Sequence, residues 1–231
     1  MERIEVSDGT MMDAYVSRAK GEQKGAGILV FQEAFGVNSY IRDIADRFAA
    51  LGFTAVAPEL FHRTGPGFEG GYDNFDPIRE HMAGLTREGL EADARAAFEC
   101  LVSQPGVDSQ RIASIGFCMG GRVSYIANAA VNLRAAISFY GGGVQDLLDL
   151  APKQNGPILM FWGGEDQHIL PEHYRAVADA LTAEGKIHEQ VVFSQADHGF
   201  FCDQRASYEP GAARQAWALV LEFLRTFGVF Q

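Results

Sequence analysis

One cysteine lies in a setting that could make its thiol a nucleophile. The segment Gly116–Gly121, with the sequence Gly-Phe-Cys-Met-Gly-Gly, separates a predicted strand from a predicted helix that begins near Met119. In this Gly-x-nucleophile-x-Gly pattern the turn is so sharp that side chains two residues either side of the nucleophile would collide. The turn would lift Cys118 above a sheet and let the Met119 N–H donate to a developing oxyanion. A helix N-terminus also favours the reactive thiolate.

Two other interpretations compete with a nucleophile at this position. Free cysteines are often buried in cores, so Cys118 could be a structural residue. The glycines could also form a nucleotide-binding loop, but the segment lacks the second glycine of Gly-x-Gly-x-x-Gly. Arg122-Val123 replaces the Lys-Ser/Thr pair of a phosphate-binding loop. The pattern therefore favours the nucleophile, which requires a base and an acid elsewhere in the chain.

The predicted acid and base follow the cysteine in chain order. This kind of turn is followed first by an acid and then by a histidine. Asp166 comes directly after the predicted strand 157–162, where carboxylates face the crevice in which parallel sheets bind ligands. Glu165 is the competing acid. His198 lies between the last predicted strand and the last predicted helix, which makes it the predicted base.

A further segment with chemical potential follows the first central strand. The second donor of an oxyanion hole normally comes from this position, and the Ala34 N–H is the candidate. Glu33 is unexpected beside it, because a carboxylate near a thiolate and an oxyanion would repel both. The alternative is that Glu33 is a solvated residue of a loop.

The elements that must position these residues alternate regularly along the chain. Short apolar runs alternate with amphipathic runs, which predicts an α/β fold with a mostly parallel sheet of seven or eight strands and helices on both faces. The predicted strands are 11–16 (part of an N-terminal hairpin), 27–31, 54–57, 111–116, 134–139, 157–162 and 189–193, and the predicted helices are 38–51, 86–103, 119–130, 171–184 and 212–227. Residues 62–80 are rich in glycine and proline, which predicts a long surface loop of the kind that often borders binding sites. We expect one domain over residues 1–231, because no repeat or linker-like composition interrupts the pattern.

Composition argues against several classes of function. The chain has 231 residues, of which 47% are hydrophobic and 21% charged, as in an ordinary globular protein. The net charge of −11, from 19 basic and 30 acidic residues, argues against a nucleic-acid partner and would weakly repel anionic substrates. Three cysteines without Cys-x-x-Cys spacing disfavour disulfides and zinc, and no metal or cofactor is expected.

The same survey predicts where the protein works. No apolar run is long enough to span a membrane, and the first residues lack the pattern of a signal peptide. We therefore expect a cytoplasmic protein with a small-molecule substrate and no membrane partner. The choice between a monomer and a homodimer stays open at this level.

Five blocks of the sequence, taken together, resemble the dienelactone hydrolase family. In family order they are Gln32–Asn38, Ala57–Phe61, Gly116–Gly121, Gly163–Asp166 and Asp197–Phe200. The resemblance implies a single-domain α/β-hydrolase fold and a triad of Cys118, His198 and Asp166. It also implies hydrolysis of an activated ester, such as the enol-lactone of a dienelactone, through an acyl-thioester. In the family, the residue that matches Glu33 holds the resting thiol and swings away when substrate binds.

The resemblance further implies two arginines that hold a substrate carboxylate, a group that a guanidinium suits well. One family arginine lies four residues after the histidine, where this chain has Cys202. The nearest arginine is Arg205, and Arg87 matches the other position. Both could equally be surface residues. Three functions thus remain open: hydrolysis of a dienelactone, a carboxylesterase for uncharged esters, and a scaffold that only binds a ligand.

Overall fold

The structure is a computed structural model that describes residues 1–19 and 25–230. The strands in these residues are β1 (Glu2–Glu5), β2 (Met11–Ser17), β3 (Gly25–Phe31), β4 (Thr54–Pro58), β5 (Val107–Phe117), β6 (Ala135–Phe139), β7 (Ile158–Gly163) and β8 (His188–Phe193). They form one sheet in the order β1-β2-β4-β3-β5-β6-β7-β8. The pairs β1–β2 and β2–β4 are antiparallel. All other pairs are parallel, which confirms the predicted sheet.

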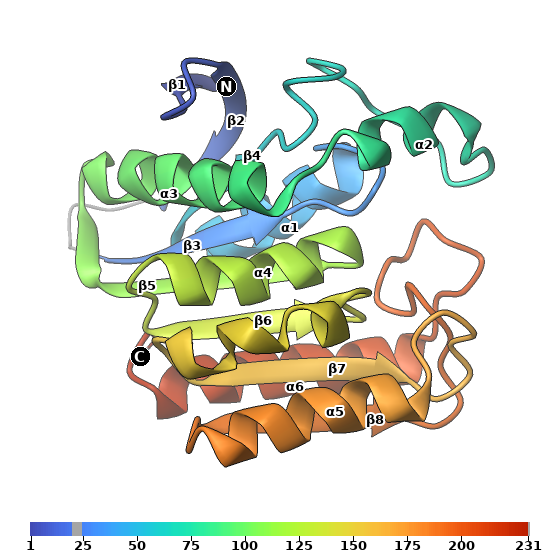
Figure 1. Cartoon of the computed structure of the whole chain (residues 1–231). Coiled ribbons are helices and arrows are strands. Elements are labelled where there is room, and N and C mark those ends of the chain that lie inside the picture. The colour runs from blue at the N-terminus through green and yellow to red at the C-terminus, as the bar shows by residue number, and fades with distance from the viewer. Residues whose placement is uncertain (20–24, 231) are drawn as a thin grey trace.

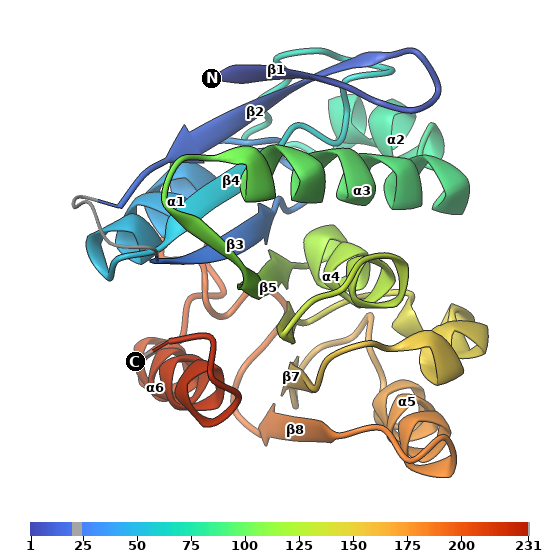
Figure 2. The same cartoon turned by 90° about the vertical axis from the view of Figure 1, so that its left-hand side faces the viewer.

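Helices cover both faces of this sheet (Figures 1 and 2). They are α1 (Ser39–Ala50), α2 (Asp76–Ala83), α3 (Arg87–Ser103), α4 (Met119–Ala130), α5 (Pro171–Ala183) and α6 (Pro210–Thr226), with short 3-10 helices η1 (Val144–Asp146) and η2 (Leu148–Lys153). Figure 2 shows α1 and α6 on one face and α3, α4 and α5 on the other. Phe48 of α1 and Trp217 of α6 pack together, with ring centroids 5.0 Å apart. None of the helices in the described residues is long and apolar enough to cross a membrane.

The prediction of a continuous loop over 62–80 was wrong at its C-terminal end. Helix α2 begins at Asp76, with Pro77 in its first turn. The glycine- and proline-rich composition predicted a loop, yet proline is tolerated in the first turn of a helix because the N–H groups there have no partner within the helix. The irregular part of the chain is thus shorter than predicted, and a helix forms its end. In Figure 1, α2 lies beside the carboxyl ends of the parallel strands.

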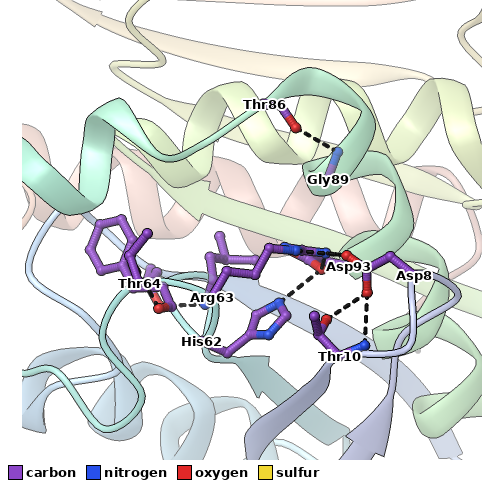
Figure 3. A network of polar contacts seen from close by, with 11 residues as sticks. Asp8, Thr10, His62, Arg63, Thr64, Thr86, Gly89 and Asp93 are labelled. Atoms are coloured by element: carbon purple, nitrogen blue, oxygen red, sulfur yellow. Dashed lines mark hydrogen bonds and ion pairs between the residues drawn. The ribbon is translucent and has the colours of Figure 1, made fainter.

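A group of polar contacts, called the anchoring cluster, joins the segment after β4 to α3 and to the β1–β2 turn (Figure 3). It consists of Asp8, His62, Arg63 and Asp93. The Arg63 guanidinium donates to the two carboxylate oxygens of Asp93 at 2.9 and 2.8 Å and to Asp8 at 2.8 Å. His62 Nε2 lies 3.1 Å from Asp93 Oδ1. These contacts fix the beginning of the segment that leads to α2.

Candidate active site

Cys118 occupies a sharp turn between β5 and α4. Its φ of 55° lies in the left-handed region, where a residue with a side chain is strained. The Cys118 N–H donates to the Phe139 carbonyl at 3.0 Å. A Cβ at Gly116 would lie 1.9 Å from the Gly120 carbonyl oxygen, and a Cβ at Gly120 would lie 2.2 Å from that of Phe31. Neither glycine can therefore carry a side chain, which confirms the steric reason for the pattern.

Asp166 and His198 meet where β7 and β8 end. Asp166 Oδ2 lies 2.7 Å from His198 Nδ1. Asp166 Oδ1 accepts hydrogen bonds from the His168 and Ile169 N–H groups at 2.7 and 3.0 Å. The side chain of Asp166 is fully buried, whereas Glu165, the competing acid, is exposed. The structure therefore brings Asp166, and not Glu165, to the histidine. Because Nδ1 of His198 is bonded to Asp166, Nε2 is the ring nitrogen that can exchange a proton with a nucleophile.

Opposing effects set the pKa values of this pair. Burial lowers the pKa of His198, but the negative charge of Cys118 and the hydrogen bond to Asp166 outweigh it and raise the pKa to about 10. Burial raises the pKa of Asp166, but the contact with His198 and the two backbone hydrogen bonds hold it below its ordinary value. The arrangement therefore favours a protonated His198 ring at neutral pH, which places a positive charge next to Cys118.

Glu33 and Arg205 form a buried ion pair beside the histidine. Arg205 Nη1 donates to Glu33 Oε1 at 3.0 Å, and the Glu33 side chain is 1% exposed. Glu33 Oε2 has no hydrogen-bond partner in the described residues. Burial raises the pKa of Glu33, although the Arg205 charge works in the opposite direction. The alternative of a solvated loop glutamate was therefore wrong. Arg205 contacts only Oε1 of Glu33, so this ion pair leaves Oε2 open to another group.

The two predicted oxyanion-hole donors flank this region. Met119 is the first residue of α4, so its N–H has no partner within the helix. Ala34 is buried in the segment that leaves β3. The Gln32 side chain steadies this segment, because it accepts from the Leu60 N–H at 3.0 Å and donates to the Glu33 carbonyl at 3.3 Å. The hydrogen bond between Gln32 and Leu60 links the segment after β3 to the segment after β4.

A cavity of about 530 Å³ opens at the carboxyl ends of the strands. Cys118 and His198 both line it, which places the predicted nucleophile and base at one surface. The other lining residues are Phe35, Tyr72, Phe75, Met82, Met119, Gly142, His168, Asp197, Arg205, Ala206 and Ser207. Within residues 1–19 and 25–230, no group of three or more His, Cys, Asp or Glu side chains is arranged to hold a metal ion.

Comparison with known proteins agrees with this architecture. The sequence profile described as the dienelactone hydrolase family matches residues 12–228. The chain belongs to the dienelactone hydrolase family. It is 34% identical over 209 residues to a Synechocystis sp. protein named "Putative carboxymethylenebutenolidase", a match that covers 86% of this chain and 85% of the relative. A Pseudomonas sp. protein named "Carboxymethylenebutenolidase" is 31% identical over 207 residues, which cover 87% of this chain and 85% of the relative.

A solved structure is similar over nearly the whole chain. A Klebsiella pneumoniae protein described as a "Putative Dienelactone Hydrolase" has a TM-score of 0.87 and 31% sequence identity, with 97% of each chain covered. Membership of the dienelactone hydrolase family confirms the predicted α/β-hydrolase fold and makes the chain a hydrolase.

The two arginines that the family resemblance implies differ in position. Arg205 lines the cavity, but Arg87 is not among the lining residues. Arg87 lies at the start of α3, where it donates to Glu91 and Asp149 at 3.2 and 2.8 Å. The prediction that Arg87 binds a substrate therefore has no support from its placement. The two acidic partners explain why, since they hold its guanidinium outside the cavity.

Several residues of the site were not predicted from the sequence. The Tyr72 hydroxyl accepts hydrogen bonds from Asn38 Nδ2 at 2.9 Å and from the Cys202 thiol at 3.4 Å. Tyr140 has a φ of 37° and, with Cys118, is one of two non-glycine residues with positive φ in the described residues. The Tyr140 ring packs on His198, with centroids 5.1 Å apart. Tyr72 belongs to the segment that sequence analysis identified only as a loop near binding sites, and Tyr140 carried no sequence signal.

Proposed function

We propose that the chain hydrolyses a carboxylic ester or lactone through an acyl-thioester on Cys118. The observation that carries this proposal is the shared cavity: a cysteine on a strained turn and a histidine bonded to a buried aspartate line the same space. These are the groups that nucleophilic acyl transfer needs, namely a nucleophile, a base and a residue that orients the base. Family membership supports the same class of reaction.

In the first half of the reaction, the Cys118 thiolate attacks the carbonyl carbon of the ester. The carbonyl oxygen becomes an oxyanion, which the N–H groups of Met119 and Ala34 are proposed to hold. When this intermediate collapses, the bond to the leaving oxygen breaks and the His198 imidazolium donates its proton to that oxygen. The product at this stage is an alcohol or enol and an acyl-thioester on Cys118.

Water completes the cycle in the second half. His198, now neutral, takes a proton from the attacking water, and Asp166 stabilises the imidazolium that forms. The thiolate leaves, the carboxylic acid is released, and the Cys118 thiolate and the His198 imidazolium are formed again. No cofactor is required by this sequence of steps.

Glu33 is proposed to be the partner of the resting thiol. Its Oε2 has no partner in the described part of the chain and is the atom that could accept the hydrogen bond of the thiol. Glu33 pairs with Arg205, whose guanidinium packs against the backbone of Gly199, the residue after His198. Glu33 would then hold the thiol until a substrate occupies the cavity, when the thiol proton passes to His198 and leaves the thiolate that attacks the ester.

Hydrolysis of para-nitrophenyl acetate by the Cys118→Ala variant tests the nucleophile. We expect kcat/KM to fall at least about 1,000-fold, because the remaining groups cannot form the acyl intermediate. The matched control is Cys100→Ser, which changes a half-buried thiol on α3 and should leave kcat/KM within about twofold. Rapid quenching followed by mass spectrometry should find the acyl group on the peptide that contains Cys118.

The outcome also separates the alternative functions. Turnover by wild type that persists in Cys118→Ala would refute the thiol mechanism. Binding of esters by wild type without release of para-nitrophenol, and without an acyl adduct, would instead support the scaffold that only binds a ligand.

A further inference from the structure

A second histidine lines the cavity besides His198. His168 lies in the loop after β7 and is exposed, and its ring stands at 89° to the His198 ring, with centroids 5.8 Å apart. This side chain has no role in the reaction proposed above. We infer that His168 binds the leaving group of the ester and favours a leaving group that carries a hydrogen-bond acceptor. This inference rests on the proposed function, because it assigns the alcohol or enol half of the substrate to one side of the cavity.

One carboxylate holds both histidines in place. Asp166 Oδ2 lies 2.7 Å from His198 Nδ1, and Asp166 Oδ1 accepts from the His168 N–H at 2.7 Å. The backbone of His168 is therefore fixed relative to the His198 ring. The ring nitrogens of His168 make no hydrogen bond to the described residues. Because an imidazole carries at least one N–H whether it is neutral or charged, a donor is available to a ligand in the cavity.

The chemistry of the site brings the leaving group to this side of the cavity. To take a proton from His198, the leaving oxygen must lie about 3 Å from Nε2. The group attached to this oxygen therefore begins next to the His198 ring, where His168 presents its polar atoms. The Asp197 side chain also lines the cavity here, but its Oδ1 already accepts from the His198 N–H at 2.6 Å. His168 is thus the donor that a leaving group can use.

Gly142 keeps the space beside this loop open. It follows β6 and lines the same cavity. A Cβ at this position would meet only the end of the Ile169 side chain, at 4.0 Å, so no close contact within the described residues requires a glycine there. Ile169 is the residue next to His168. The missing side chain therefore leaves room for a substrate where the leaving group is expected, as glycine does where a ligand approaches the backbone closely.

Two esters of similar shape test the inference. Para-acetylphenyl propanoate and para-isopropylphenyl propanoate transfer the same acyl group, but only the first has an acceptor oxygen on its leaving group. His168→Phe keeps an aromatic ring and removes the N–H. We expect kcat/KM to fall about fivefold to tenfold for the acetylphenyl ester, as when one hydrogen bond is lost, and to stay within about twofold for the isopropylphenyl ester. Equal losses for the two esters would overturn the inference.

The two halves of the reaction separate a leaving-group contact from a structural role. The acyl-thioester no longer contains the leaving group, so His168→Phe should leave the rate constant for deacylation within about twofold of wild type. A variant that merely displaced His198 would slow both halves, because His198 transfers a proton in each. Stopped-flow release of the phenol measures acylation, and mass spectrometry of the propanoyl-enzyme over time measures deacylation. Deacylation that slows as much as acylation would overturn the inference.

A neighbouring residue provides the matched control. Gln167 is exposed in the same loop and is not among the residues that line the cavity. Gln167→Ala should therefore leave kcat/KM within about twofold for both esters. A loss in this control that is as large and as selective as in His168→Phe would mean that the loop, and not the His168 imidazole, distinguishes the leaving groups, which would contradict the inference.

A binding measurement keeps this test independent of turnover. Calorimetry compares para-hydroxyacetophenone and para-isopropylphenol, which are the two leaving groups as free phenols, in Cys118→Ala with and without the added His168→Phe substitution. We expect His168→Phe to weaken binding of para-hydroxyacetophenone about fivefold and to leave binding of para-isopropylphenol within about twofold. Equal changes for the two phenols would overturn the inference. The selective effect on binding in an enzyme that hydrolyses no ester would refute the proposed function alone.

Discussion

Two regions of the molecule bury a carboxylate beside an arginine and a histidine. They differ in how many of the carboxylate oxygens accept a hydrogen bond. In the anchoring cluster, both oxygens of Asp93 accept from Arg63, and His62 adds a third contact. At the candidate active site, Glu33 receives one hydrogen bond, and its Oε2 has no partner in the described residues. Both side chains are at most 1% exposed.

The difference indicates what each region is for. A buried carboxylate with all its hydrogen bonds made stabilises one conformation of the chain, because any movement would leave a charge unpaired. A buried carboxylate with an unpaired oxygen is destabilising and persists where it is needed for chemistry. Burial raises the pKa of Glu33, as this view requires. Residue types alone do not distinguish the two clusters, whereas their hydrogen bonds do.

The largest effect on stability is expected for Asp93→Asn. The amide removes the buried one of the two carboxylate charges that face Arg63. We expect the free energy of unfolding to fall by about 3 kcal/mol, as when one partner of a buried pair is lost. Urea unfolding followed by circular dichroism measures the change. The control Asp43→Asn removes an exposed partner of Arg47 and should cost less than about 1 kcal/mol. Equal losses in the two variants would contradict the role of the anchoring cluster.

In contrast to Asp93→Asn, Glu33→Gln should change the reaction rate much more than the stability of the fold. Because the cost of burying the carboxylate offsets much of its attraction to Arg205, we expect the free energy of unfolding to change by less than about 1 kcal/mol. The rate constant for acylation should fall by about 10- to 100-fold, since the partner of the thiol is lost. Stopped-flow release of para-nitrophenol measures this step. Acylation at the wild-type rate, or a loss of stability as large as in Asp93→Asn, would contradict the different roles assigned to the two regions.

The pKa of His198 provides a third comparison within the site. The negative charge of Cys118 is the largest of the effects that raise this pKa to about 10, so Cys118→Ser should lower it towards the ordinary value of 6.5. Because the folded-state pKa is raised, the stability from these contacts is full below about pH 6.5 and is lost as the pH rises towards about 10.

Nuclear magnetic resonance of imidazole protons across this pH range measures the shift directly. Urea unfolding at intervals over the same range should show a smaller loss of stability with rising pH in Cys118→Ser than in wild type. An unchanged His198 titration in the variant would mean that the thiol does not face the ring.

The sequence was most informative where short-range sterics decide the structure. The strained turn at Cys118 was predictable because the contact that forbids a side chain at Gly116 is with Gly120, only four residues away. Asp166 and His198 were predictable because they follow consecutive strands of the same sheet. The pairing of Glu33 with Arg205 joins positions 172 residues apart and depends on how two segments pack, which no local pattern encodes. The place of Phe75 and Met82 in the cavity lining was missed for the same reason.

The smallest effect is expected for Arg87→Met, which extends the comparison to an exposed arginine. Arg87 is 32% exposed, and its partners Glu91 and Asp149 are 32% and 58% exposed, so solvent screens both pairs. We expect the free energy of unfolding to change by less than about 1 kcal/mol, in contrast to the loss in Asp93→Asn. Urea unfolding at low and high salt tests this, because any contribution from exposed pairs should weaken as salt increases. The free energy of unfolding could instead fall by about 3 kcal/mol at both salt concentrations. That result would mean that the number of carboxylates around an arginine, rather than their burial, determines how much the ion pairs stabilise the fold.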